Sequence, residues 1–95
     1  MQTLISQITA TSVDTTITLC GWIQNIRSSG KVAFIELRDG SGYIQCVIEA
    51  KNFSPEQFEE ISTLGIESSI ALTGTVSKHP KKEEYELQVS DYSIF

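Results

Sequence analysis

Residues 33–48 read AFIELRDGSGYIQCVI, which is two runs of alternating apolar and polar side chains on either side of the segment DGSG. An alternation with period two is typical of a strand that has one face buried. The glycines at positions 40 and 42 supply the positive φ that a tight reversal needs. We therefore expect an antiparallel hairpin whose strands cover residues 33–38 and 43–48.

The same alternation recurs on both sides of this hairpin. Before it, Ile17, Leu19, Gly21 and Ile23 share one parity in a run that we expect to end at the residues SSG, positions 28–30. After it, residues 69–77 and 85–90 alternate in the same way. The chain thus contains five predicted strands.

One segment changes period. Ser54, Pro55 and Gln57 form the pattern of a capping box with proline at the first helical position, and apolar side chains follow at positions 58, 61 and 64. We expect a helix over Pro55–Leu64, between the third and fourth strands. Five strands with one helix after the third is the element order of the OB-fold, a Greek-key barrel. The predicted fold class is therefore all-β with one helix.

Length and charge limit the possible functions. The 95 residues suit one domain, residues 1–95, and the net charge of -5 excludes bulk electrostatic attraction to nucleic acid or anionic lipid. No segment is apolar enough to span a membrane, and Met1–Ala10 carries no targeting pattern. We expect a cytoplasmic protein in which Cys20 and Cys46 are buried, reduced thiols.

Four side chains on the polar faces of these strands are candidates for ligand binding. Phe34 has the parity of Glu36 rather than of the core residues, so its ring lies outside, either as a stacking platform for a base or under another segment of the chain. Gln45 and Glu86 share that outward parity, and Arg27 lies at the end of the first strand. A carboxamide offers the donor and acceptor that uracil requires, although solvated strand surface is the plainer interpretation of the two polar residues.

The acidic residues are concentrated outside this face. Residues 49–67 hold five acids and one base, whereas basic side chains lie in the first hairpin and before the fifth strand. Five of these basic side chains could form a rim of phosphate contacts, or could simply keep the loops soluble. They are Lys31, Arg38, Lys78, Lys81 and Lys82. The single histidine, His79, has no metal-ligand spacing around it, and no nucleophile motif is present. We expect no metal site and no catalytic residue in these 95 residues.

Several segments resemble the N-terminal anticodon-binding domain of class IIb aminoacyl-tRNA synthetases. They are ITLCGWI at 17–23, RSSGK at 27–31, FIELRDGSGYIQ at 34–45, ESS at 67–69, TGTV at 73–76 and YELQV at 85–89. Within that group, which serves aspartate, asparagine and lysine, the combination is most similar to the enzymes for asparagine. The family's ATP-binding arginine motifs are absent from these residues, so ATP and Mg²⁺ are expected only for the catalytic domain of a parent enzyme.

The resemblance implies a role for each candidate residue. The central anticodon uridine would stack on Phe34, Gln45 would read it by hydrogen bonds, Glu86 would lie against the same base, and Arg27 would steady the backbone. The implied partner is a tRNA anticodon loop, bound by a monomeric domain whose parent is a homodimer. Three alternatives stay open: an aspartate enzyme, a general single-strand-binding OB domain, and a protein-interaction domain that uses the acidic helix.

Overall fold

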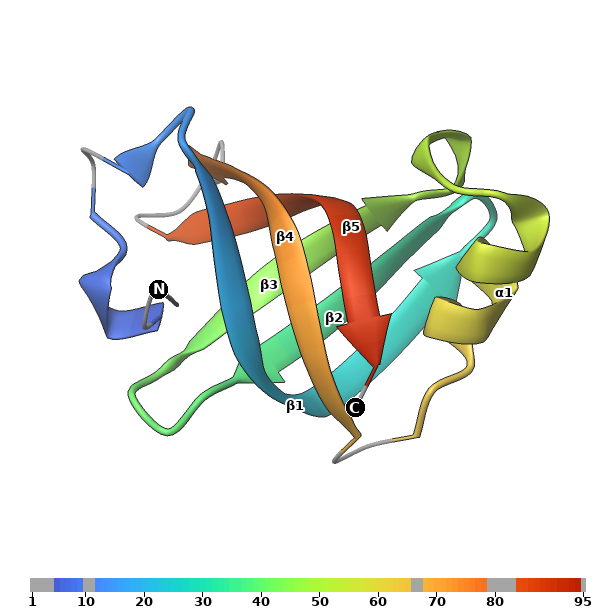
Figure 1. Cartoon of the computed structure of the whole chain (residues 1–95), viewed down its shortest axis with the longest axis horizontal. Helices are drawn as coiled ribbons and strands as arrows, with labels where there is room; N and C mark the ends of the chain where they lie inside the picture. The colour runs from blue at the N-terminus through green and yellow to red at the C-terminus, as the bar shows by residue number, and fades with distance from the viewer. Residues whose placement is uncertain (1–4, 10–11, 66–67, 79–83, 95) are drawn as a thin grey trace.

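The computed structural model describes residues 5–9, 12–65, 68–78 and 84–94, and its elements follow the predicted order (Figure 1). The strands are β1 (Thr16–Ser29), β2 (Val32–Arg38), β3 (Tyr43–Glu49), β4 (Ser69–Lys78) and β5 (Tyr85–Ile94). Helix α1 (Pro55–Ser62) lies between β3 and β4, and two 3-10 turns, η1 (Ile5–Gln7) and η3 (Ala50–Asn52), precede β1 and α1. The predicted fold class is confirmed.

The strands close into a barrel in the order β1-β2-β3-β5-β4. The long strand β1 closes it, because its first half pairs with β4 and its second half pairs with β2. All neighbours are antiparallel except β3 and β5, which run parallel with Gln45 opposite Glu86. This arrangement is the five-stranded OB barrel that the element order predicts.

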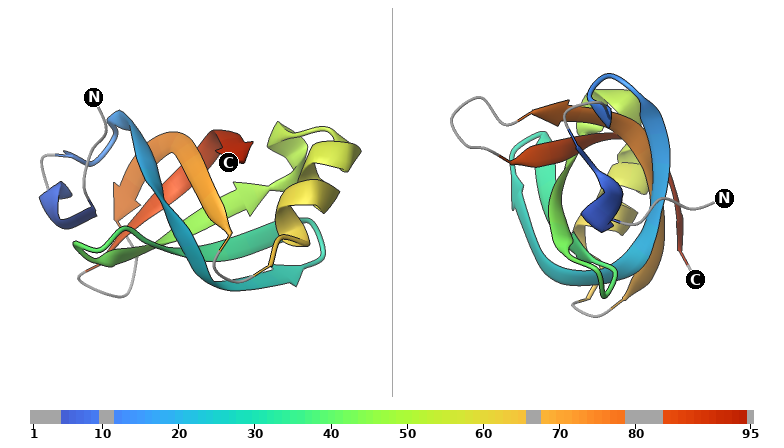
Figure 2. Two further views of the ribbon diagram at one scale, coloured as in Figure 1. Left: turned by 60° about the horizontal axis from the view of Figure 1, so that its bottom comes forward. Right: turned by 90° about the vertical axis from the view of Figure 1, so that its left-hand side faces the viewer.

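The barrel interior is filled by the inward parity of every strand. Ala33, Ile35 and Leu37 of β2 are fully buried, as the alternation predicts. The two ends are covered by different elements: α1 lies at one end and η1 at the other (Figure 2). Ile61 of α1 and Ile5 of η1 both belong to the buried core.

The β2–β3 turn is fixed by Asp39. Gly40 has a φ of 91°, and one carboxylate oxygen of Asp39 accepts from the amide N–H of Ser41 at 2.8 Å and from its hydroxyl at 2.6 Å. The other oxygen accepts from the amide N–H of Ile5 at 2.8 Å, which holds η1 against the turn. Partial burial would raise the pKa of Asp39, but the hydrogen bonds from Ser41, Ile5 and Gly42 outweigh it and lower that pKa.

Two glycines lie where strands approach too closely for a side chain. A Cβ on Gly74 would lie 2.7 Å from the carbonyl carbon of Gln88 and 2.8 Å from the Cα of Val89, where the β4–β5 register shifts. A Cβ on Gly21 would lie 2.9 Å from the carbonyl carbon of Arg38. Both clashes involve backbone, which cannot rotate away as a side chain can.

The predicted start of α1 is confirmed and its predicted end is not. The Ser54 hydroxyl accepts from the Gln57 amide at 3.2 Å, and the Gln57 side chain accepts from the Ser54 amide at 3.0 Å. The helix ends at Ser62 rather than at Leu64, because the backbone of Thr63, at φ -110° and ψ 7°, leaves the helical region, while its amide and its hydroxyl both donate to the carbonyl of Glu59. Within the described residues α1 is the longest helix at 8 residues, and none there could cross a bilayer.

Replacing Ser54 with alanine is expected to lower the free energy of unfolding by about 0.5–2 kcal/mol, because the first turn of α1 loses its cap. Thermal denaturation followed by circular dichroism measures the change. Ser62→Ala is the matched control, since the Ser62 hydroxyl bonds a helix carbonyl at 3.2 Å and alanine favours the helix. Equal losses in the two variants would contradict the capping role.

Three expectations are wrong in detail. Ser28 and Ser29 do not break the first strand: they belong to β1, which ends at Ser29, because they pair with Ala33 and Val32, and the reversal follows at Gly30, whose φ is 63°. The fifth strand continues past Ser90 to Ile94, since its last residues pair with β4. Cys20 is half-buried rather than buried, because its parity places it on the outer face of β1.

Candidate nucleic-acid interface

Four strands bring the candidate residues together on one outer face. In the β1–β2 pairing Arg27 lies opposite Phe34, and in the β3–β5 pairing Gln45 lies opposite Glu86. Glu36 connects the two pairs, since it lies two residues after Phe34 and opposite Gln45. Neighbouring strands are roughly 4.8 Å apart, so these side chains form one continuous surface.

The ring of Phe34 lies outside the core and is half-buried. The guanidinium carbon of Arg27 lies 5.6 Å from the ring centroid, which is a cation–π contact across the β1–β2 pair. The Arg27 side chain itself is exposed. A flat aromatic surface with an adjacent exposed cation is suited to a stacked base and its phosphate.

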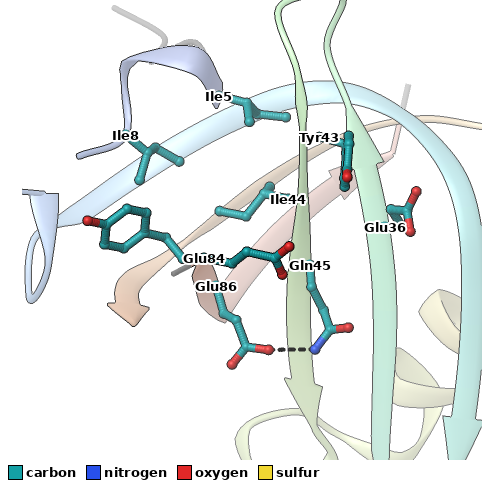
Figure 3. A pocket seen from close by; sticks show the side chains of 9 residues that line it. Ile5, Ile8, Glu36, Tyr43, Ile44, Gln45, Glu84 and Glu86 are labelled. Atoms are coloured by element: carbon teal, nitrogen blue, oxygen red, sulfur yellow. Dashed lines mark hydrogen bonds between the residues drawn. The ribbon is translucent and has the colours of Figure 1, made fainter. Parts of the chain in front are cut away.

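Gln45 and Glu86 form a hydrogen bond across the parallel strands. The side-chain nitrogen Nε2 of Gln45 donates to Oε2 of Glu86 at 2.5 Å, and both residues are partly buried. Figure 3 shows the amide nitrogen turned to Glu86 and the amide oxygen on the opposite side. A bond to a carboxylate is stronger than one between neutral groups, so it holds the amide firmly.

Two cavities meet at Gln45. The smaller, about 260 Å³, is lined by Asn25, Arg27, Phe34, Glu36 and Gln45. The larger, about 470 Å³, is shown in Figure 3 and is lined by Ile5, Ile8, Glu36, Tyr43, Ile44, Gln45, Glu84, Tyr85 and Glu86. Because Gln45 and Glu36 line both, a ligand in one cavity is adjacent to a ligand in the other.

The two cavities differ in charge. The smaller is lined by Arg27 together with Glu36, whereas the larger is bordered by Glu36, Glu84 and Glu86, with no lysine or arginine among the described residues that line it. Carboxylates accept hydrogen bonds and repel phosphates. The larger cavity therefore suits a group rich in N–H donors, and a phosphate backbone would pass on the Arg27 side.

The three residues of the predicted basic rim that the structure describes are not gathered into one patch. Lys31 precedes β2 and Arg38 ends it, so the two lie at opposite ends of a strand that spans roughly 20 Å. Lys78 is at the end of β4. Lys81 and Lys82 lie outside the described residues, as does His79. Among the rim candidates that the structure describes, Lys31 is the one placed at the Phe34 end of β2.

Sequence reasoning missed Tyr43, which lines the larger cavity and is 64% exposed. Tyr43 precedes Gln45 by two residues and so has the same outward parity, which means that the alternation alone could have identified it. Trp22 is 38% exposed and lies opposite Arg38, which in turn lies opposite Tyr43. Two exposed aromatic rings thus flank Arg38 beyond the four predicted residues.

The thiol beneath this face is not reactive. Burial raises the pKa of Cys46 far above its usual range, and the carboxylate of Glu86 raises it further. Cys46 therefore remains a neutral thiol inside the barrel. In the part of the chain that the structure describes, no group of three histidine, cysteine, aspartate or glutamate side chains is arranged to hold a metal ion.

Comparison with known families agrees with this geometry. The model of the tRNA anti-codon family, described as an OB-fold nucleic acid binding domain, matches residues 17–95. The chain belongs to this family. The resemblance to class IIb anticodon-binding domains that the sequence motifs indicate is therefore confirmed.

Among the proteins that are similar to this chain are two asparagine–tRNA ligases. That of Symbiobacterium thermophilum is 46% identical over 80 residues, which are 83% of this chain and 18% of that protein. That of Sorangium cellulosum is 41% identical over 83 residues, or 86% of this chain and 19% of that protein. The chain thus spans about one fifth of the length of these relatives.

A solved structure has the same fold. The asparaginyl-tRNA synthetase of Pyrococcus horikoshii, complexed with asparaginyl-adenylate, superposes with a TM-score of 0.91 at 24% identity. The match covers 99% of this chain and 22% of that one.

Proposed function

We propose that this chain is the anticodon-reading module of an asparagine–tRNA ligase, and that it binds the anticodon loop of tRNA by stacking the central uridine on Phe34. The observation that carries the proposal is the row Arg27, Phe34, Gln45 and Glu86 on one outer face, beside two adjacent cavities. Membership of an OB-fold nucleic acid binding family supports it.

Stacking supplies the affinity and hydrogen bonding supplies the choice of base. A base on an aromatic ring contributes about 1–3 kcal/mol and does so for any base. The base takes the ring face that Arg27 covers, and the guanidinium turns to the phosphate. Gln45 borders the same cavity as Phe34 and presents its amide oxygen to the N3–H of uracil.

The charges on this face determine the path that the RNA backbone takes across it. Phosphates pass Arg27 and Lys31, while the neighbouring base enters the cavity bordered by Glu84 and Glu86, with the Tyr43 ring beside it. Arg38, Lys78, Lys81 and Lys82 remain expected phosphate contacts. With a net charge of -5 the domain binds weakly and loses affinity as salt rises.

We place the module in the cytoplasm, as a monomeric domain of a homodimeric parent enzyme. The module itself uses no cofactor, and ATP and Mg²⁺ serve the ligase reaction of the parent. An aspartate enzyme is the nearest alternative, since its tRNA shares the central uridine.

Titration with two anticodon stem-loops tests the function. A loop with the asparagine anticodon should bind about tenfold more tightly than one whose central uridine is replaced by cytidine, the difference expected for one good hydrogen bond gained or left unmade. Fluorescence anisotropy at low salt measures both. Equal affinity for the two loops and for an unrelated single strand would favour a general single-strand-binding domain instead.

A further inference from the structure

The amide of Gln45 has one allowed orientation. A carboxylate accepts hydrogen bonds and has no proton to donate, so the group of Gln45 that faces Glu86 at 2.5 Å must be Nε2. Rotating the amide by half a turn would bring Oε1 against the carboxylate of Glu86, which sets two acceptors against each other. The parallel β3–β5 pairing keeps the two side chains directly opposite, so the constraint is built into the barrel.

We propose that Glu86 is a positioning residue, which fixes the amide of Gln45 in the orientation that accepts from uracil and rejects cytosine. This inference rests on the proposed function. The amide oxygen faces away from Glu86 (Figure 3), and Gln45 borders the cavity that contains the Phe34 ring. Glu86 itself does not line that smaller cavity, so it acts through Gln45.

The discrimination follows from the atom at position 3 of the pyrimidine. In uracil N3 carries a proton, which the amide oxygen of Gln45 accepts. In cytosine N3 is an acceptor, so a cytosine in the same position would set its N3 lone pair against the amide oxygen of Gln45. Only a flip of the amide would remove this repulsion. Glu86 prevents that flip. A glutamine at position 86 would allow it, because an amide can donate as well as accept.

The test is Glu86→Gln, assayed with the uridine and cytidine stem-loops. We expect the wild-type preference of about tenfold to fall to within about twofold, chiefly through tighter binding of the cytidine loop, since one hydrogen bond is at stake. Glu49→Gln is the matched control. It removes the same charge from the same outward row of β3, four residues after Gln45, and Glu49 lines neither cavity, so both loops should gain equally and the preference should stay.

A double-mutant cycle separates positioning from direct contact. Gln45→Leu should abolish the preference, and adding Glu86→Gln to Gln45→Leu should then leave the two loops equal, although both gain affinity from the lost charge. An unchanged preference in Glu86→Gln, or a preference that Glu86→Gln changes in the Gln45→Leu background, would overturn the inference while leaving the proposed function in place. A wild-type domain that binds both loops equally would overturn both. In spectra of the free protein, the side-chain NH₂ signals of Gln45 should move in Glu86→Gln and stay in Glu49→Gln, which tests the bond independently of RNA.

Discussion

Gly74→Ala is expected to lose about 3 kcal/mol of the free energy of unfolding, at the upper end of the cost of overpacking. The new Cβ would lie 2.7 Å from the carbonyl carbon of Gln88 and 2.8 Å from the Cα of Val89, so β4 and β5 must separate to admit it. For a domain of this size that loss lowers the melting temperature by roughly 12–24 °C. Differential scanning calorimetry measures it directly.

Gly65→Ala is the control for this change. A Cβ at position 65 meets nothing closer than the Ser68 hydroxyl at 3.9 Å, and Gly65 does not have a positive φ. Its melting temperature should stay within a few degrees of wild type. If Gly74→Ala proved equally mild, the close approach of β4 and β5 at the register shift would be wrong.

Phe34→Ala is expected to weaken binding of the asparagine anticodon loop by about 5- to 150-fold, the range given by loss of one stacked base. The ring lies outside the barrel core, where its partner is Arg27, so the melting temperature should change little. Phe34→Tyr keeps an aromatic face and should retain most of the affinity. Anisotropy titrations at fixed low salt measure all three proteins.

Phe58 supplies the matched control for Phe34. It is a half-buried phenylalanine that packs against the core from α1, on the element that covers one end of the barrel. Phe58→Ala should lower the melting temperature while the folded protein binds RNA as before. If Phe34→Ala were instead to lose stability and keep its affinity, Phe34 would be a packing residue and the stacking role would be wrong.

Much of the fold is predictable because it is encoded locally. The alternation around residues 39–42 fixes which side chains are buried in β2 and β3, and the capping box at Ser54 fixes where α1 begins. Boundaries are less predictable because they depend on the neighbouring strand. Ser28 and Ser29 remain in β1 because β2 offers them backbone partners, which no property of two serines indicates.

The site is predictable in its residues and less so in their contacts. Parity alone places Phe34, Gln45 and Glu86 outward, but the bond between Gln45 and Glu86 depends on the parallel contact of two strands 41 residues apart. The separation of Lys31 from Arg38 likewise follows from the length of β2, which a count of basic residues ignores. The roles of these residues in binding RNA remain predictions.

The first turn of the chain bears on how this barrel could be engineered. Ile5 is buried in the core, and its amide is held by Asp39 in a turn that also bonds the backbone of Ser6 through Ser41. A shortened version that starts near β1 would leave Ile44 uncovered and prone to self-association. A binding scaffold made from this domain should therefore keep η1 and vary the outward positions of β1, β2 and β3.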